Sequence, residues 1–341
     1  MTAAVPVPAD RATPATPGTP VRVGTRASTL ARVQSAAVAE RLTAGTGRPA
    51  ALVEVTTRGD VDHGPLVRIG GTGVFVSALR ETLVAGEVDV AVHSLKDLPT
   101  AAADGIELAA VPLREDPRDV VVARDGLTLG ELPPGSTVGT GSPRRAAQLR
   151  ALGLGLEVVD VRGNVETRLR RVHDGHLDAV LLARAGLARL GRLDEVTEAL
   201  DPLQMMPAAG QGALAVECRA GDPIAAELRA TLDDPDSRVA VTAERAFLAA
   251  VEAGCSAPVG ALAEQVWVAA GEAGTGSEDA DAAEDELWLR GVVVDVSGRP
   301  LLRLATTGSP RDPEAVGRGL AAEMLAEGAA ALIAGVPGAE P

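Results

Sequence analysis

Cationic side chains recur along the chain at points where a strand is expected to end and a helix to begin. Arginine accounts for all but one of the 32 basic residues, and the exception is Lys96. The guanidinium group is a planar fork that binds a carboxylate or phosphate through two hydrogen bonds. Any one arginine could be an ordinary surface residue, but their recurrence predicts a small ligand with several carboxylates or phosphates. The set comprises Arg26, Arg144, Arg145, Arg162, Arg168 and Arg189.

An acidic residue, Asp97, directly follows the single lysine. A carboxylate among cations stays ionised. It could therefore stabilise a positive charge that develops during a reaction, or pass a proton to a leaving group. The alternative is a structural aspartate held in an ion pair.

Cys255 lies in a segment that favours a loop, because Gly254 and Ser256 flank it and Pro258 follows closely. A thiol on a loop can act as a nucleophile or as a point of covalent attachment. Free cysteines are more often buried as small apolar residues. Cys218, at the end of an expected strand, fits that buried description better than Cys255.

Composition excludes several classes of protein. The 341-residue chain has a net charge of −15 and 1% aromatic residues, so it lacks the basic surface and stacking side chains of nucleic-acid binders. Charges interrupt the apolar stretches well before the roughly 20 residues that span a bilayer. Residues 1–20 carry no secretory signal and are expected to form a disordered tail. Two cysteines without CxxC spacing fit a reducing cytoplasm, and no metal site is predicted.

The elements that must position these residues alternate between strands and helices over most of the chain. This alternation predicts βαβ units around a mostly parallel sheet, with the cations at the edge where ligands bind in open α/β sheets. Helix N-termini at that edge also favour anions. The expected strands cover residues 21–23, 51–57, 89–92, 119–123, 137–139, 156–161, 179–182 and 213–217.

The last third of the chain changes character. A helix is expected over residues 237–251, followed by strands near 259–268, 287–296 and 301–304 and a helix over 313–326. This order predicts a small antiparallel sheet with helices, a third domain that presents Cys255 on a loop. The acidic stretch 271–286 is expected to be a solvated insertion.

Nine short segments, taken in order, resemble the hydroxymethylbilane synthase (porphobilinogen deaminase) family. No single segment is specific, but the ordered set is. The segments are VGTRAS (23–28), TRGD (57–60), HSLKDLP (93–99), REDPRD (114–119), SPRR (142–145), RGN (162–164), GQGA (210–213), AERA (243–246) and GC (254–255).

The resemblance implies an α/β fold of three domains. Two are βαβ lobes of the periplasmic-binding-protein type, and the third is a small α+β domain with an antiparallel sheet that carries the cysteine. The implied boundaries are residues 21–113 with 213–232 for domain 1, 114–212 for domain 2, and 233–341 for domain 3 with the insertion at 271–286.

The resemblance also implies an activity and roles for residues. Four porphobilinogen molecules would be joined head to tail, each with loss of ammonia, on a dipyrromethane cofactor bound to Cys255 through a thioether. Hydrolysis would then release the linear tetrapyrrole. Asp97 would be the catalytic residue. The other implied cofactor-binding residues are Lys96, Ser142, Arg144, Arg145, Arg162 and Arg168, and the implied substrate-binding residues are Arg26, Ser28, Arg189 and Gln211.

Two readings from other classes compete with this one. The first is a non-catalytic protein of the same two-lobed architecture that binds a small anion. The second is an acyl or phosphoryl transferase with Cys255 as its nucleophile, although no histidine is placed by sequence to act as its base. The family resemblance further implies a monomer in the cytoplasm, without nucleic-acid or membrane partners.

Overall fold

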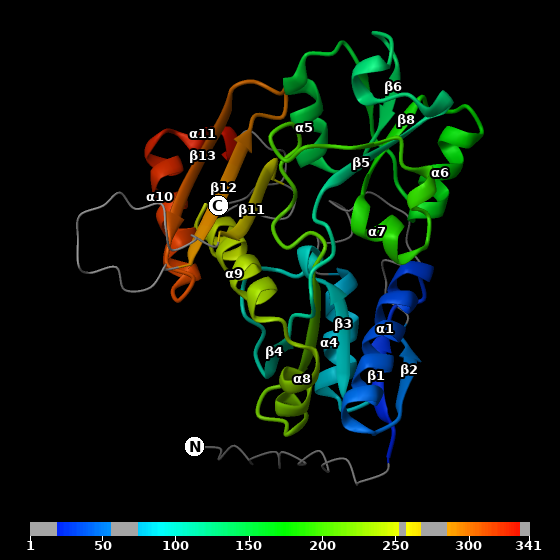
Figure 1. Ribbon diagram of the computed structural model, residues 1–341, viewed down its shortest axis with the longest axis vertical. Helices are drawn as coiled ribbons and strands as arrows, with labels where there is room; N and C mark the ends of the chain where they lie inside the picture. Colours follow the sequence, from blue (N-terminus) through cyan, green and yellow to red (C-terminus); the bar gives the residue numbers. More distant parts are fainter. Residues whose placement is uncertain (1–18, 56–73, 252–256, 267–284, 335–341) are drawn as a thin grey trace, which may run out of the picture.

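The computed structural model describes residues 19–55, 74–251, 257–266 and 285–334 (Figure 1). Two α/β lobes lie one above the other in this view, and a third domain packs beside both. Each lobe is built on a five-stranded sheet, and the third domain on a three-stranded antiparallel sheet. The predicted fold class, two α/β lobes and a small antiparallel domain, is confirmed.

The first lobe contains a sheet with strand order β2-β1-β3-β10-β4. Strand β1 runs parallel to β2 and β3, whereas β10 runs antiparallel to both β3 and β4. The strands are β1 (Val21–Thr25), β2 (Ala50–Glu54), β3 (Val90–Ser94), β4 (Ile106–Ala110) and β10 (Leu214–Arg219). Its helices are α1 (Thr29–Thr46), α4 (Val74–Val84) and α8 (Ile224–Leu232).

The second lobe repeats this plan with the strand order β7-β6-β8-β5-β9. Strand β6 is parallel to β7 and β8, and β5 is antiparallel to β8 and β9. The strands are β5 (Asp119–Ala123), β6 (Thr137–Gly139), β7 (Glu157–Val159), β8 (Ala179–Ala183) and β9 (Glu198–Ala199). Its helices are α5 (Pro143–Leu152), α6 (Val165–His173) and α7 (Arg184–Arg189).

The chain crosses between the lobes twice, through residues 111–118 and 200–213. Each crossing delivers a strand, β5 or β10, into the middle of the sheet it enters. The delivered strand enters from the edge facing the other lobe, where the parallel strands end, so it runs against them. The expectation of mostly parallel sheets is therefore confirmed for strand direction: four of the five strands in each sheet run the same way, and β10 or β5 alone runs against them.

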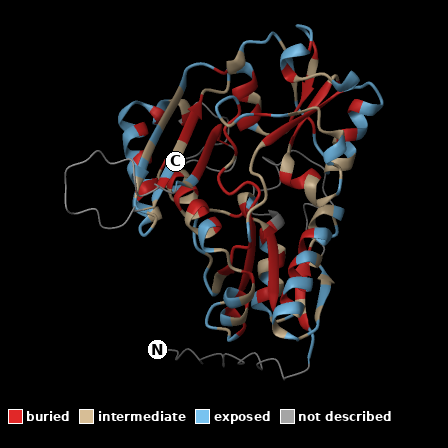
Figure 2. Ribbon diagram, viewed as in Figure 1, coloured by how far each residue is buried: buried red, intermediate tan, exposed pale blue. Residues whose placement is uncertain are grey.

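The third domain packs helices against one face of its sheet. The strands are β11 (Val259–Val266), β12 (Glu286–Val294) and β13 (Leu301–Gly308), and the helices are α9 (Pro235–Ala250), α10 (Pro313–Ala326) and α11 (Ala329–Ala334). Phe247, Leu320 and Met324 are fully buried in its core. A side chain at Gly291 would meet the Phe247 ring at 2.9 Å, so the glycine lets α9 approach the sheet. Figure 2 shows buried residues along both helices and strands of this domain.

The third domain also contacts the second lobe through helix α5. Ala147 of that helix shares a buried apolar cluster with Leu262 and Val292. Arg150 donates a hydrogen bond to the carbonyl of Val296 at 2.7 Å. The face of α5 opposite the second lobe's sheet is thus fixed by the third domain. No helix in the described ranges is long and apolar enough to cross a membrane.

Candidate active site

Strand β3 delivers the Lys96–Asp97 pair to the edge of the first lobe that faces the second. A short 3-10 helix, Leu95–Asp97, follows the strand directly, and the fully buried Leu95 anchors it. Asp97 is exposed. It lines an open pocket together with Arg26 and Ser28. Residues from two predicted motifs, VGTRAS and HSLKDLP, therefore meet around one hollow.

The pocket is also lined by residues that were not predicted from the sequence to be site residues. Gln34, His93 and Ser94 line it, and the Gln34 amide donates a hydrogen bond to the Ser94 hydroxyl at 3.2 Å. Gln34 lies on α1, which begins after Ser28 because the Ser28 hydroxyl accepts a hydrogen bond from the amide of Ala31. The signal for Gln34 was its position two turns into a helix that starts at a predicted binding residue.

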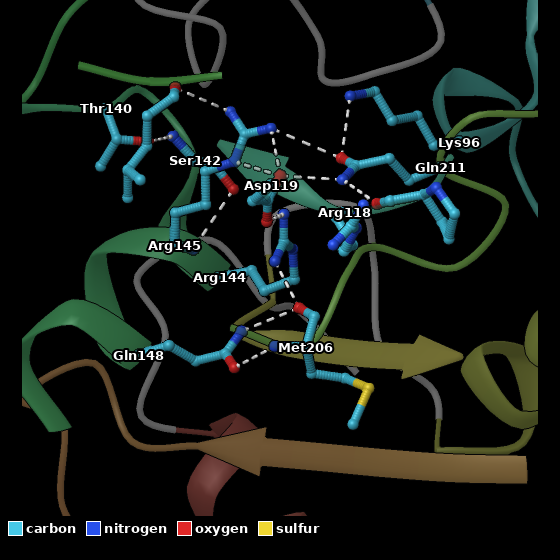
Figure 3. Close-up of polar contacts among 12 residues, drawn as sticks. Lys96, Arg118, Asp119, Thr140, Ser142, Arg144, Arg145, Gln148, Met206 and Gln211 are labelled. Carbon is cyan, nitrogen blue, oxygen red and sulfur yellow. Dashed lines mark hydrogen bonds and ion pairs between the residues drawn. The ribbon is translucent and has the colours of Figure 1, made fainter. Parts of the chain in front are cut away.

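Helix α5 brings the predicted residues Ser142, Arg144 and Arg145 to the facing edge of the second lobe. The Ser142 hydroxyl caps the helix by accepting from the amide of Arg145 at 3.4 Å, and Pro143 occupies its first turn. Both arginines are buried, with 4% and 5% of their surface exposed. They point toward Asp119, which is fully buried at the start of β5 (Figure 3).

Asp119 forms ion pairs with both arginines. Its Oδ1 receives Arg145 Nε at 3.1 Å and Arg145 Nη2 at 2.7 Å, and its Oδ2 pairs with Arg144 Nη2 at 2.7 Å. Asp119 ends the REDPRD segment but was not predicted from the sequence to be a site residue. The available signal was a carboxylate that opens a strand expected to be buried, since a buried charge requires a partner.

Gln211 connects this arrangement to the first lobe. It lies in the second crossing segment, and its amide nitrogen donates to Asp119 Oδ1 at 2.8 Å and to the Pro117 carbonyl at 2.6 Å. Its amide oxygen accepts from Lys96 Nζ at 3.2 Å and from Arg145 Nη2 at 3.4 Å (Figure 3). We refer to Lys96, Asp119, Arg144, Arg145 and Gln211 as the interlobe cluster.

The interlobe cluster carries more positive than negative charge, since its charged members are three cations and one carboxylate. Burial and the neighbouring Arg145 lower the pKa of Lys96 to about 8, although Asp97 and Asp119 act in the opposite direction. An anion bound nearby would stabilise the ammonium form of Lys96.

Arg168 extends this region of uncompensated charge. Burial, Arg145 and Arg162 lower its pKa to about 10, and Asp160 offsets them only in part. Its Nε donates to the Gly163 carbonyl at 2.9 Å. Arg162 is more exposed and pairs with Asp160 at 3.0 Å. Partly buried cations that repel one another favour an anionic ligand.

Arg189 lies beside the second crossing segment, and its Nη2 donates to the Gly212 carbonyl at 2.6 Å. Burial lowers the pKa of Arg189, and Glu115 opposes that shift. Cys255 and residues 58–60 lie outside the described residues, as does most of the acidic segment 271–286. Within the described part of the chain, no group of three His, Cys, Asp or Glu side chains could hold a metal ion.

Two α/β lobes that meet at surplus buried cations are the arrangement expected of a protein that binds a small anion between its lobes. Two family models that match this chain indicate its chemistry. Residues 21–227 match the dipyrromethane cofactor binding domain of porphobilinogen deaminase, and residues 238–326 match the C-terminal domain of the same enzyme. The chain belongs to the porphobilinogen deaminase family.

Curated relatives agree with this assignment in sequence. The chain is 57% identical to porphobilinogen deaminase of Mycobacterium tuberculosis (strain H37Rv) over 317 residues, covering 93% of this chain and 99% of the relative. It is 55% identical to that of Nocardia farcinica, covering 95% and 91%. Among solved structures, the methionine-binding protein MetQ is 11% identical with a TM-score of 0.41, covering 62% of this chain and 89% of that one.

The expectation of a hydroxymethylbilane synthase is therefore confirmed. The chain is a transferase of tetrapyrrole biosynthesis that uses porphobilinogen and a dipyrromethane cofactor. Neither competing reading, the non-catalytic anion binder or the acyl or phosphoryl transferase, fits a chain that matches both domains of this enzyme.

Proposed function

We propose that the three cations of the interlobe cluster, with Arg168, Arg162 and Ser142, hold the carboxylates of the dipyrromethane cofactor. The observation that carries this assignment is the surplus of partly buried positive charge, expressed in the lowered pKa values of Lys96 and Arg168. Each pyrrole ring bears an acetate and a propionate, so a dipyrrole brings several negative charges to that region. Its charge and the donor set therefore fit one another.

We further propose that Cys255 forms the thioether that attaches the cofactor. When bound, the cofactor supplies the pyrrole carbon to which the first porphobilinogen is joined. The tether fixes one end of the growing chain, while the cations bind its carboxylates. Each added ring increases the negative charge, so further arginines along the path would be engaged in turn.

Asp97 is proposed as the catalytic residue because its exposed carboxylate lies on the pocket. The aminomethyl group of porphobilinogen leaves as ammonia, and positive charge develops on the substrate as its carbon–nitrogen bond breaks. A fixed carboxylate next to that carbon stabilises the developing charge. Arg26 and Ser28 line the same pocket, where they would bind the substrate's carboxylates. Arg189 and Gln211 would complete substrate binding from the second lobe and the crossing segment.

We also propose that the enzyme is a cytoplasmic monomer. Support for a reducing compartment comes from Cys218, a free and fully buried cysteine. A size-exclusion measurement with light scattering would test the monomer, and a dimer mass would contradict it.

The attachment is tested by the intact mass of the purified protein beside that of a Cys255→Ser variant, with Ehrlich's reagent as a colour test. We expect an added mass of two linked pyrroles in the wild type and none in the variant. An Asp97→Asn variant should keep the added mass and lose turnover. A wild-type chain of unmodified mass would contradict the role of Cys255, and full turnover by Asp97→Asn would contradict that of Asp97.

A further inference from the structure

Asp119 contacts three proposed binding residues, more than any of those residues contacts among the others, yet it has no exposed oxygen for a ligand. It is fully buried, and its two carboxylate oxygens contact Arg144, Arg145 and Gln211. Burial alone would raise the pKa of Asp119, but the two arginines and the Gln211 amide hold it well below its usual range. The residue is therefore a permanent anion at the centre of the interlobe cluster.

The two arginines that share Asp119 are engaged differently. Arg144 pairs with Oδ2 and donates from Nη1 to the Met206 carbonyl, a backbone group that Gln148 also holds. Met206 packs into the apolar cluster between α5 and the third domain. Arg144 is thus directed into the junction of the second lobe with the third domain, away from Lys96 (Figure 3).

Arg145 is directed toward the first lobe instead. It donates from Nε and Nη2 to Asp119, from Nη2 to Gln211 and from Nη1 to the Leu181 carbonyl. These contacts occupy four of its five N–H groups. Among the described residues, the remaining Nη1 hydrogen has no acceptor. The charge of Arg145 also lowers the pKa values of Lys96 and Arg168, so it lies among the proposed cofactor-binding cations.

We propose that Asp119 is a positioning residue that gives the adjacent arginines separate tasks. It pairs with Arg144, which also donates to the Met206 carbonyl, and so fixes that guanidinium at the junction of the second lobe with the third domain. It also holds Arg145 and Gln211 in the orientation that presents Arg145 and Lys96 to the cofactor. This inference rests on the proposed roles of Arg145 and Lys96 in binding the cofactor.

The charge of Asp119 also acts on Lys96. The charged groups that influence Lys96 are Asp97 and Asp119, which favour its ammonium form, and Arg144 and Arg145, which disfavour it. Removing the carboxylate of Asp119 lowers the pKa of Lys96 further below about 8. Removing the charge of Arg144 raises it.

The test compares full-length Asp119→Asn, Arg144→Gln and Arg145→Gln with the wild type. The first readout is the fraction of purified protein that carries the dipyrrole mass. The second is the pH at which kcat/KM for porphobilinogen begins to fall. Asp119→Asn should lower the cofactor-bearing fraction or raise KM on the order of tenfold, as expected when a buried hydrogen-bond partner is lost. Its pH inflection should move down, and that of Arg144→Gln should move up.

Asp89→Asn is the matched control. Asp89 is a buried carboxylate at the far end of the first lobe, where it accepts hydrogen bonds from Arg22 at 2.6–3.1 Å. Its replacement should lower thermal stability without changing the cofactor fraction or the pH inflection. If Asp119→Asn behaves like this control, the positioning role is wrong.

The variants also separate this inference from the proposed site. If Arg145→Gln loses the cofactor but Asp119→Asn does not, the site assignment stands and the positioning role fails. If Arg145→Gln retains the cofactor and its KM, the assignment of Arg145 itself is wrong. Should Asp119→Asn fail to fold, Arg144→Gln decides: an unchanged or lowered pH inflection overturns the inference, and a raised one supports it.

Discussion

Arg114 and Glu244 form a two-pronged ion pair, with hydrogen bonds of 2.7 and 3.0 Å, where the three domains meet. Arg114 lies in the first crossing segment and Glu244 on α9 of the third domain. Glu244 also accepts from the amide of Gly210 in the second crossing at 2.6 Å and from Ala263 of β11 at 2.9 Å. One fully buried carboxylate therefore joins both crossings to the third domain.

Replacing Glu244 by Gln should destabilise the protein by about 3–5 kcal/mol, because Arg114 would keep a buried charge without its partner. Urea unfolding measures the change. Glu314→Gln is the control, since Glu314 pairs with Arg318 on an exposed helix face, and its loss should cost roughly 0.5 kcal/mol or less. Equal losses in the two variants would show that the buried pair contributes no more than a surface pair.

The activity should decrease with rising pH through Lys96. Its pKa falls from 10.5 to about 8 in the folded protein, so the ammonium form is lost as the pH rises through about 8. The KM for porphobilinogen should therefore rise above that pH. Lys96→Arg, which remains charged, should show no inflection near pH 8, even if its kcat/KM is lower. The same inflection in both proteins would exclude Lys96 as its source.

The lowered pKa of Lys96 should affect stability in the opposite direction from activity: stability increases as the pH rises. Between pH 8 and 10.5 the unfolded chain binds the lysine proton more tightly than the folded one. The free energy of unfolding contributed by this group therefore increases with pH across that window. Denaturation at several pH values would measure the difference in the free energy of unfolding between the wild type and Lys96→Met. That difference should narrow toward pH 10.

Gly212 should tolerate no side chain. Its φ is +89°, and an added Cβ would lie 2.3 Å from the carbonyl oxygen of Glu115 in the other crossing. Gly86 has a similar φ of +74° but no atom within 4 Å of the added carbon. Gly86→Ala should cost about 1 kcal/mol from its backbone conformation alone. Gly212→Ala should cost at least about 2 kcal/mol in total, because overpacking adds to that cost. Similar unfolding midpoints for Gly86→Ala and Gly212→Ala would show that the two crossing segments do not approach each other closely at Gly212.

Cys218 should be inert in the folded protein. Burial, Glu107 and Asp222 raise the pKa of its thiol to about 12, and the side chain is fully buried. Since the thiolate is the reactive form, iodoacetamide at pH 8 should leave Cys218 unmodified until the protein is denatured. Peptide mapping by mass spectrometry checks this outcome. Stoichiometric labelling of the native protein would show that β10 opens readily.

The sequence predicted most elements that carry the site because apolar runs and turn residues are local signals. It placed Asp97 after a strand and the arginines near strand ends, and the structure shows both arrangements. It did not predict β4, β9 or α8. The two-residue β9 gives too little pattern to detect, and β4 carries only moderate alternation.

Contacts between distant residues were beyond the reach of local patterns. Arg144 and Arg145 were expected to face a ligand, but their burial around Asp119 depends on residues 26 positions apart. The antiparallel direction of β5 and β10 likewise depends on how the chain crosses between lobes. The recurrence of arginines thus predicted which side chains lie near the site. It did not predict which hydrogen-bond partners each arginine would have.

The return of the chain to the first lobe as β10 has a consequence for the order in which the protein folds during synthesis. Among the described strands, β4 pairs with β10 alone, so the sheet of the first lobe stays incomplete until residue 219 has been made. The sheet of the second lobe uses only strands from Asp119 to Ala199. On the ribosome, the lobe that begins second can close first, and the N-terminal segment must wait with an unpaired edge until the chain returns.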